Sequence, residues 1–218
     1  MKSEHRWALR LLLIATLSGV GYGQQTPTVT FTLDFPGANP GHYEIVVGSD
    51  GEGTYKSDGK INDQSDPAED GFTKFTASQD VRSQIFDLAK KAHYFSGKVD
   101  SGHKNLANTG NKTLAYKDAT HNLQATYNFS LIQPVAQLTA LFQGLSTTLE
   151  LGRRLAYFHK YQKLGLDDEL KSVEELQKSE VLTDVPAIAP VLKEIAEDSS
   201  VMNVSRARAL RLLAATRK

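Results

Sequence analysis

The sequence predicts an α+β protein: an antiparallel sheet of two hairpins plus an N-terminal strand, with helices on one face, followed by an all-helical C-terminal extension. Three observations lead to this prediction. Hydrophobic residues recur at every second position in several segments of the first half, two segments of helical period interrupt them, and beyond Thr147 only the helical period remains. Two hairpins that are each followed by a helix are typical of a sheet covered by helices on one side.

The N-terminal strand and the first hairpin are defined by this alternation. Residues 29–35 are hydrophobic at every second position, which predicts a strand with one buried face. The next alternating stretch turns at Gly51, and two registers have to be compared. A two-residue loop would place Ile45 opposite Lys56 and divide the hydrophobic side chains between the two faces. A three-residue loop with a left-handed Gly51 places Ile45 opposite Tyr55 and keeps one face hydrophobic, so we expect this register.

A short strand and a helix are expected after the first hairpin. Residues 72–75 form the short hydrophobic segment, and residues 81–92 carry hydrophobic side chains at spacings of three and four, which predicts an amphipathic helix. Two caps for the start of this helix remain open: Ser78 alone, or a capping box of Thr76 with Gln79.

The second hairpin is predicted over residues 112–130. A four-residue turn places Leu114 opposite Ala125 and keeps the hydrophobic side chains of the second strand on one face. Pro134 suits the first position of a helix, so a second helix is expected to begin there.

Residues beyond Thr147 are predicted to be helical throughout. Thr147 and Glu150 match a capping box, which predicts that a new helix starts at this point. Further helices are expected to begin near Asp167, near Pro186 and near Asn203. The last of these is expected to bury a stripe made of Ala207, Leu210 and Leu213.

Charge is segregated within the helical extension. Basic residues cluster on its first helix and acidic residues on the second, so an antiparallel arrangement would bring opposite charges together. These residues are Arg153, Arg154, Lys160 and Lys163 on one side and Asp167, Asp168, Glu169, Glu174 and Glu175 on the other. The basic C-terminal end is expected to be a solvated face, and docking on an anionic envelope surface is the alternative.

The first 23 residues have the features of a secretory signal peptide. A basic head precedes a hydrophobic run, and small residues lead to Gly23 before Gln24. The alternative, a membrane anchor, is disfavoured because the run is shorter than the roughly 20 residues that cross a bilayer. The predicted organisation is therefore a signal peptide in residues 1–23, an α+β domain in residues 24–146 and a helical extension in residues 147–218. We expect an exported protein, periplasmic or secreted, with no membrane span after signal removal.

Composition excludes several classes of protein. The chain has 25 basic and 25 acidic residues, and this balance argues against nucleic acid as a partner, because phosphate binding needs a concentrated basic surface. It has no cysteine, so disulfides and thiolate zinc sites are excluded. The core must therefore be an ordinary hydrophobic one.

Residues 43–55 have the pattern Tyr-x-apolar-x-apolar-x-x-Asp-Gly-x-Gly-x-Tyr, and the following helix ends in His93-Tyr94-Phe95. This combination resembles a small uncharacterised domain of bacterial exported proteins across residues 28–145. The segment Gly37-Ala38-Asn39-Pro40 departs from the Gly-x-Cys-Pro that such proteins often carry. The resemblance implies an envelope setting and a fold, and it brings no known activity or catalytic residue.

Residues 186–216 resemble a single HEAT-type helical pair. A solenoid needs about three repeats to bury its own core. We therefore expect these helices to pack on the first domain.

The candidate contact site lies in the polar loop of residues 96–111. We expect contact with a ligand or partner there through Asp100, Ser101, His103, Lys104 and Asn105. Catalysis by His103 with Ser101 or Asp100 is disfavoured, because triad members normally come from separate segments of the chain. The sequence also has no Gly-x-Ser-x-Gly elbow.

No metal, cofactor or catalytic residue is predicted. The acidic residues of the segment 58–70 do not have the spacing of a calcium loop. The histidines lack the spacing of a zinc site, and we expect His42, His93, His121 and His159 to lie at the surface.

The expected function is that of an exported, soluble, non-catalytic interaction or binding module of the bacterial cell envelope, whose partner is an unidentified protein or envelope component. The alternative is a small envelope hydrolase that uses the 96–111 loop around His103. A distant acid or nucleophile within hydrogen-bond reach of His103 would favour the hydrolase, whereas a loop that stands in solvent favours the module.

Overall fold

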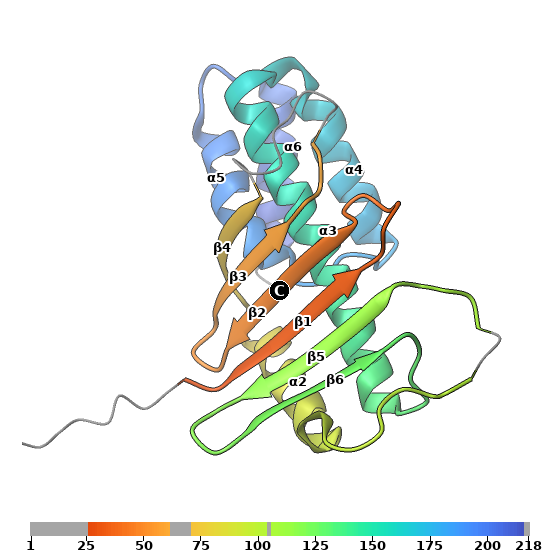
Figure 1. Cartoon of the computed structure of the whole chain (residues 1–218). Helices are drawn as coiled ribbons and strands as arrows, with labels where there is room; N and C mark the ends of the chain where they lie inside the picture. Colours follow the sequence, from red (N-terminus) through yellow and green to blue (C-terminus); the bar gives the residue numbers. More distant parts are fainter. Residues whose placement is uncertain (1–25, 62–70, 104–105, 216–218) are drawn as a thin grey trace, which may run out of the picture.

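The computed structural model describes residues 26–61, 71–103 and 106–215, and its dominant feature is a six-stranded antiparallel sheet (Figure 1). The strand order across the sheet is β4-β3-β2-β1-β5-β6. The N-terminal strand is therefore central, and each hairpin extends the sheet on one side of it. The strands are β1 (Thr28–Asp34), β2 (His42–Gly48), β3 (Glu52–Ser57), β4 (Phe72–Thr76), β5 (Asn111–Lys117) and β6 (Asn122–Tyr127).

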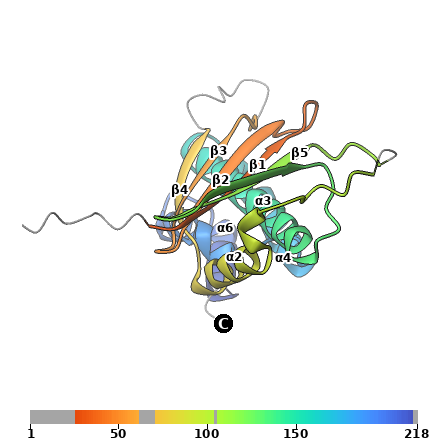
Figure 2. The same cartoon turned by 60° about the horizontal axis from the view of Figure 1, so that its bottom comes forward.

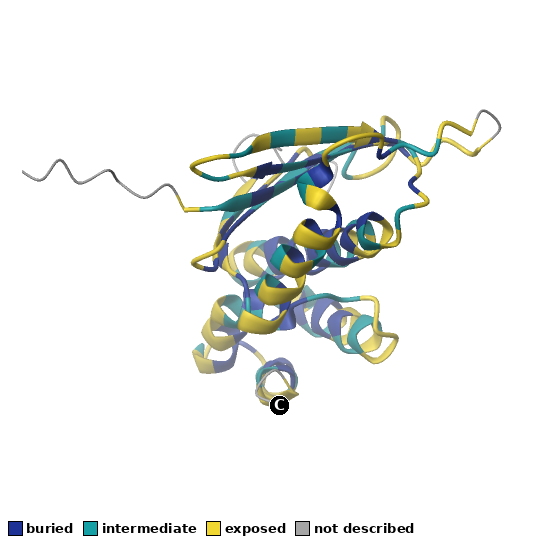
Figure 3. Cartoon of the chain, turned by 90° about the horizontal axis from the view of Figure 1, so that it is seen from below, coloured by how far each residue is buried: buried dark blue, intermediate teal, exposed yellow. Residues whose placement is uncertain are grey.

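The helices cover one face of this sheet and leave the other open, so the predicted α+β class is confirmed (Figures 2 and 3). In Figure 3 the buried residues concentrate between the sheet and the helices and among the helices themselves. The helices are α2 (Gln79–Lys91), α3 (Gln133–Tyr161), α4 (Leu166–Lys178), α5 (Ala189–Glu197) and α6 (Asn203–Ala215), with short 3-10 turns η1 (His93–Phe95), η2 (Lys163–Gly165) and η3 (Val185–Ile188).

Both predicted hairpin registers are confirmed. Ile45 pairs with Tyr55, and Gly51 has a φ of 95°, the left-handed conformation that the three-residue loop requires. Leu114 pairs with Ala125 in the second hairpin. The buried face of each hairpin thus lies on the same side of the sheet.

The core beneath the sheet is closed by aromatic packing. Phe31 of β1 stacks on Phe142 of α3, with ring centroids 5.2 Å apart and an interplanar angle of 3°. Both side chains are fully buried.

Near the edge of the sheet Gly53 lies under the ring of Phe75, its partner across the β3–β4 ladder, and a Cβ at this position would lie 2.5 Å from the ring. A glycine is required here because the aromatic ring occupies the space of a side chain.

Helix α2 begins with one of the two caps that the sequence allowed. Ser78 is the N-cap, and its hydroxyl accepts a hydrogen bond from the backbone N–H of Val81 at 3.4 Å. The chain leaves the helix through left-handed His93, Tyr94 and Phe95, and Phe95 is buried against the sheet.

The predicted helix start at Thr147 is wrong. Helix α3 runs without interruption over 29 residues, and the boundary between residues 146 and 147 falls inside it. The Thr147 hydroxyl donates to the carbonyl of Gln143, one turn earlier, at 3.1 Å. A threonine and a glutamate three residues apart also fit the interior of a helix, so the capping pattern does not by itself define an N-terminus.

A second hydrophobic core lies among the helices of the extension. Leu151 and Leu155, from the C-terminal half of α3, are buried in it with side chains from α4, α5 and α6. The predicted inner stripe of α6 is wrong at Ala207 and Leu210, which are exposed, whereas Leu213 packs partly buried against this core; the buried residues are Ser205, Ala209 and Leu212. Leucines at three nearby positions make either stripe compatible with the helical period, and only packing distinguishes them.

The ion pairs between helices follow the predicted segregation only in part. Arg154 of α3 pairs with Glu169 of α4, as expected. Lys163 instead pairs with Asp198 at the end of α5, and Arg208 of the C-terminal helix contacts both Asp167 and Glu174 of α4. Part of the basic charge of the C-terminal end is therefore matched by α4.

The predicted helix near Pro186 is a 3-10 turn, η3, followed by α5. Asp184 precedes this turn and connects the extension to the layer that contains the sheet and α2. Its Oδ2 accepts a hydrogen bond from the backbone N–H of Ser78 at 3.0 Å, at the start of α2. Its Oδ1 is buried and has no hydrogen-bond partner among the described residues. Burial raises the pKa of this carboxyl, and the nearby charge of Asp80 raises it further.

Within the three described segments, none of the helices combines the length and the hydrophobicity that crossing a bilayer requires. The predicted signal peptide lies outside the described residues.

Replacement of Thr147 by alanine tests the continuity of α3. Inside a helix alanine is favoured over threonine by a few tenths of a kcal/mol, so we expect Thr147→Ala to increase the free energy of unfolding slightly. An N-cap at this position would instead lose about 1 kcal/mol. Urea denaturation measures the sign, and Ser78→Ala, which removes a true N-cap, is the control that should lose stability.

Replacement of Asp184 by asparagine tests the buried carboxyl. Above pH 3.8, the ordinary pKa of an aspartate, Asp184 loses its proton in the unfolded chain but keeps it in the folded chain. The free energy of unfolding therefore falls as the pH rises from 3.8 to the raised pKa of the folded state. We expect Asp184→Asn to stabilise the fold at neutral pH by about 1 kcal/mol, because a neutral amide also suits the left-handed backbone. Urea denaturation from acidic to neutral pH should show this advantage shrinking in acid.

Asp198→Asn is the control of opposite sign. Hydrogen bonds from Lys163 and Ser200 lower the pKa of Asp198, so its contribution is present above the ordinary pKa and is lost in acid. The variant should be less stable than the parent chain at neutral pH. Equal pH profiles for Asp184→Asn and the parent chain would contradict the account of Asp184.

Candidate functional site

The sequence-predicted contact residues of the 96–111 loop hold the loop backbone. Asp100 accepts hydrogen bonds from the backbone N–H groups of Gly102 at 2.7 Å and Asn128 at 2.9 Å, and these bonds lower the pKa of its carboxyl. The backbone N–H of Ser101 donates to the carbonyl of Phe129 at 2.8 Å, and its hydroxyl accepts from the backbone of His103. Lys104 and Asn105 lie outside the described residues.

A buried lysine closes the other end of the same loop. The ammonium of Lys112 donates to the backbone carbonyls of Thr109, Gly110 and Asn128, each at 3.0 Å, and to the Thr109 hydroxyl at 2.9 Å. Lys112 is only 4% exposed, and burial lowers the pKa of its ammonium. The loop is therefore attached at its base by Asp100 and Lys112, and sequence reasoning did not find the lysine.

His103 does not assemble a catalytic group in the described part of the chain. Its backbone N–H bonds to Ser101, and its side chain is exposed at the surface of the loop, which extends away from the sheet and helices in Figure 1. No acid or nucleophile from a distant described segment is hydrogen-bonded to its ring. The described part of this loop therefore stands in solvent around His103.

Three of the other histidines pair with a single aspartate each. His42 contacts Asp34, His121 contacts Asp118, and His159 contacts Asp198. Over the residues that the structure describes, no cluster of three or more histidine or acidic side chains is placed to hold a metal ion. Most of the acidic segment 58–70 lies outside those residues.

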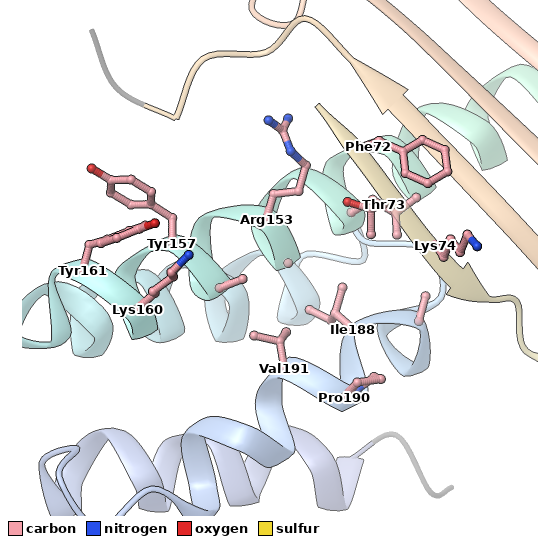
Figure 4. A pocket seen from close by; sticks show the side chains of 14 residues that line it. Phe72, Thr73, Lys74, Arg153, Tyr157, Lys160, Tyr161, Ile188, Pro190 and Val191 are labelled. Atoms are coloured by element: carbon pink, nitrogen blue, oxygen red, sulfur yellow. The ribbon is translucent and has the colours of Figure 1, made fainter. Parts of the chain in front are cut away.

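A groove with a hydrophobic and aromatic lining lies beside strand β4, and we call it the edge groove (Figure 4). It has a volume of about 320 Å³ and lies between the edge of the sheet, helix α3 and the start of α5. Its lining residues are Phe72, Thr73, Lys74, Leu149, Gly152, Arg153, Ala156, Tyr157, Lys160, Tyr161, Ala187, Ile188, Pro190 and Val191. Three segments that are far apart in the sequence thus build one surface.

The edge groove has a hydrophobic floor and an aromatic end. Gly152 allows α3 to approach η3 closely, since a Cβ at this position would lie 2.5 Å from Ile188. Tyr157 and Tyr161, one helical turn apart, have ring centroids 5.2 Å apart, and the ammonium of Lys160 lies 4.8 Å from the centre of the Tyr161 ring. Figure 4 shows these three side chains at the end of the groove farthest from β4.

A polar network fixes the side of the edge groove that faces β3. The Arg153 guanidinium donates to both carboxylate oxygens of Glu150 at 2.8 Å and to the carbonyl of Gly59 at 3.2 Å. The Tyr55 hydroxyl donates to Glu150 at 2.6 Å and lies 3.1 Å from the Ser146 hydroxyl. Burial raises the pKa of Tyr55, which keeps it a protonated donor.

The groove charge is one-sided. Its lining residues include Lys74, Arg153 and Lys160 but no aspartate or glutamate. Glu150 offsets the charge of Arg153 from behind the lining. The arrangement suits a ligand with a hydrophobic portion and negative charge, and it contains no pair of acid and base placed for catalysis.

Sequence reasoning did not identify the edge groove. The available signals were the aromatic residues Tyr157 and Tyr161, which follow the hydrophobic stripe of α3 onto an exposed surface, and the partly exposed Phe72. Comparisons with protein-family models, with curated proteins and with solved structures each found no match to this chain. The candidate site is therefore defined by its geometry.

Replacement of Lys112 by methionine tests the attachment of the 96–111 loop. Three backbone carbonyl oxygens, one buried and two partly buried, would lose their donor, so we expect the free energy of unfolding to fall by about 2 kcal/mol. Amide hydrogen exchange in residues 106–111 should also accelerate. Lys117→Met, on an exposed position at the end of β5, is the matched control and should stay within about 0.5 kcal/mol of the parent chain. Equal losses of stability from both variants would contradict the proposed role of Lys112 in holding the base of the loop.

Proposed function

We propose that this protein is an exported, non-catalytic binding module of the bacterial cell envelope and that the edge groove is its binding site. The observation that carries the proposal is the groove itself: hydrophobic and aromatic side chains with the exposed lysines Lys74 and Lys160 and no carboxylate in the lining. Export is supported by the basic head and hydrophobic run of the first 23 residues.

Binding rather than catalysis is supported by the use of the polar side chains. Asp100 and Lys112 hold backbone groups of the loop, and Glu150 and Arg153 hold each other and β3. Groups committed to such bonds are not available to transfer protons to a substrate. The edge groove, by contrast, is lined mainly by hydrophobic and aromatic side chains with a few polar groups, which is the usual composition of a ligand site.

The groove favours a ligand that is partly hydrophobic and negatively charged. Ile188 and Val191 supply the hydrophobic wall, and Tyr157 supplies an aromatic surface with a polar tip. Lys74 and Lys160 give the rim its positive charge. A hydrophobic ligand without charge would gain the hydrophobic and aromatic contacts but no attraction to the lysines.

Two fluorescent probes of matched shape test this proposal on the mature chain, purified from the exported fraction and checked for an N-terminus at Gln24. Anilinonaphthalene sulfonate carries an aromatic body and a negative charge, and phenylnaphthylamine carries the same body without the charge. We expect the sulfonate to bind about tenfold more tightly, a difference of about 1.4 kcal/mol. Ala156→Trp, which fills the groove, should abolish its binding.

Ala207→Trp is the control for the added indole, because Ala207 is an exposed residue on α6 away from the groove. It should leave the affinity for the sulfonate unchanged. Equal binding of the sulfonate by the parent chain and by Ala156→Trp would show that the edge groove is not the binding site.

A further inference from the structure

The outer edge of strand β4 presents unpaired backbone groups. β4 pairs only with β3, because it is the last strand of the sheet. The backbone N–H of Ser57 donates to the carbonyl of Gly71, and that of Ala77 donates to the carbonyl of Gly51, each at 2.8 Å. Backbone groups alternate in direction along an antiparallel strand, so those of Phe72 and Lys74 point away from β3.

No described residue pairs with these outward groups. The backbone N–H and C=O of Phe72 and Lys74 make no hydrogen bond to any other part of the described chain. The strand is short and carries Lys74, which discourages indiscriminate pairing, but it contains neither a proline nor a bulge that would block the edge. An open row of this kind is a template for another strand.

The open edge lies directly on the edge groove. Phe72 and Lys74 line the groove together with Ile188 and Val191, and Figure 4 shows β4 beside the turn that carries Ile188. We propose that the edge groove receives an extended polypeptide segment of a partner, which adds to β4 as a seventh strand. This inference rests on the proposed function and names the class of its ligand.

The two faces of the sheet define the chemistry of that segment. Side chains of an added strand that point toward the helices meet the hydrophobic floor of the groove, so this set must be hydrophobic. Those that point to the open face lie beside Phe72 and Lys74 of β4, and Lys56, opposite Phe72 in the β3–β4 ladder, adds positive charge one strand further in. Both lysines are exposed, and neither has an ion-pair partner among the described residues. The partner segment therefore alternates hydrophobic and acidic residues.

A short peptide of alternating valine and glutamate, labelled with fluorescein, is the probe. Fluorescence polarisation measures its affinity for the mature chain. A counterpart with lysine in place of glutamate should bind about tenfold more weakly, because it places like charges beside Lys74 and near Lys56.

Backbone methylation of the peptide tests strand addition itself. One version carries N-methyl groups on every valine and the other on every glutamate, so each loses the donors of one edge and keeps its side chains. Since the valines must face the groove, only one of the two sets donates to β4. We expect one version to lose about tenfold or more in affinity and the other to bind like the parent peptide.

A matched pair of protein variants gives the reciprocal test. Lys74→Ala removes the charge, whereas Lys74→Pro removes the charge and the outward N–H, and proline is tolerated on the open side of an edge strand. Lys74→Pro should bind the peptide about tenfold more weakly than Lys74→Ala. If Lys74→Pro fails to fold, as judged by circular dichroism, the methylated peptides decide the question.

The outcomes separate this inference from the proposed function. Equal affinity for both methylated peptides and the parent peptide overturns strand addition, and sulfonate binding that Ala156→Trp abolishes still upholds the groove as a binding site. A concentration-dependent dimer that Lys74→Pro converts to a monomer, without peptide binding, overturns the peptide in favour of a second copy of this chain.

Discussion

Helix α3 is shared by two hydrophobic cores, and most of the structure depends on that sharing. Its first half buries Leu138, Phe142 and Leu145 under the sheet, and its second half buries Leu151 and Leu155 among the helices of the extension. A helix of 29 residues spans roughly 43 Å at a rise of 1.5 Å per residue, which is long enough to reach across both layers. The helical extension therefore has its position relative to the sheet set by a continuous backbone rather than by a linker.

The edge groove is a consequence of this arrangement. Leu149, Gly152 and Ala156 lie on the stretch of α3 that leaves the first core and enters the second, where the helix passes the β4 edge of the sheet. The Tyr55, Glu150 and Arg153 network holds this stretch against β3. Buried charges give little net stability, but they penalise alternative placements in which one partner is left unpaired, so the network fixes how α3 crosses the sheet edge.

The polar loop and the edge groove show how composition can mislead the search for a site. The 96–111 loop contains histidine, serine and acidic residues, yet Asp100 is satisfied by backbone N–H groups, and the lysine that closes the loop holds backbone carbonyls. The groove is built from residues such as Ile188 and Val191, which in sequence are indistinguishable from core residues. Function in this protein is therefore proposed for a surface that local sequence does not mark.

Local patterns determined the strands and their registers, because a shift of one residue in the Ile45–Tyr55 or Leu114–Ala125 pairing would expose a hydrophobic face. They also limited the start of α2 to two possible caps, of which the structure uses Ser78 to satisfy an N–H that the helix cannot. The uninterrupted α3, the buried stripe through Ser205 and Leu212, and the edge groove were decided only by the tertiary structure. Each of these depends on contacts between segments distant in the chain, and a sequence with more than one acceptable helical stripe or cap leaves the choice to that packing.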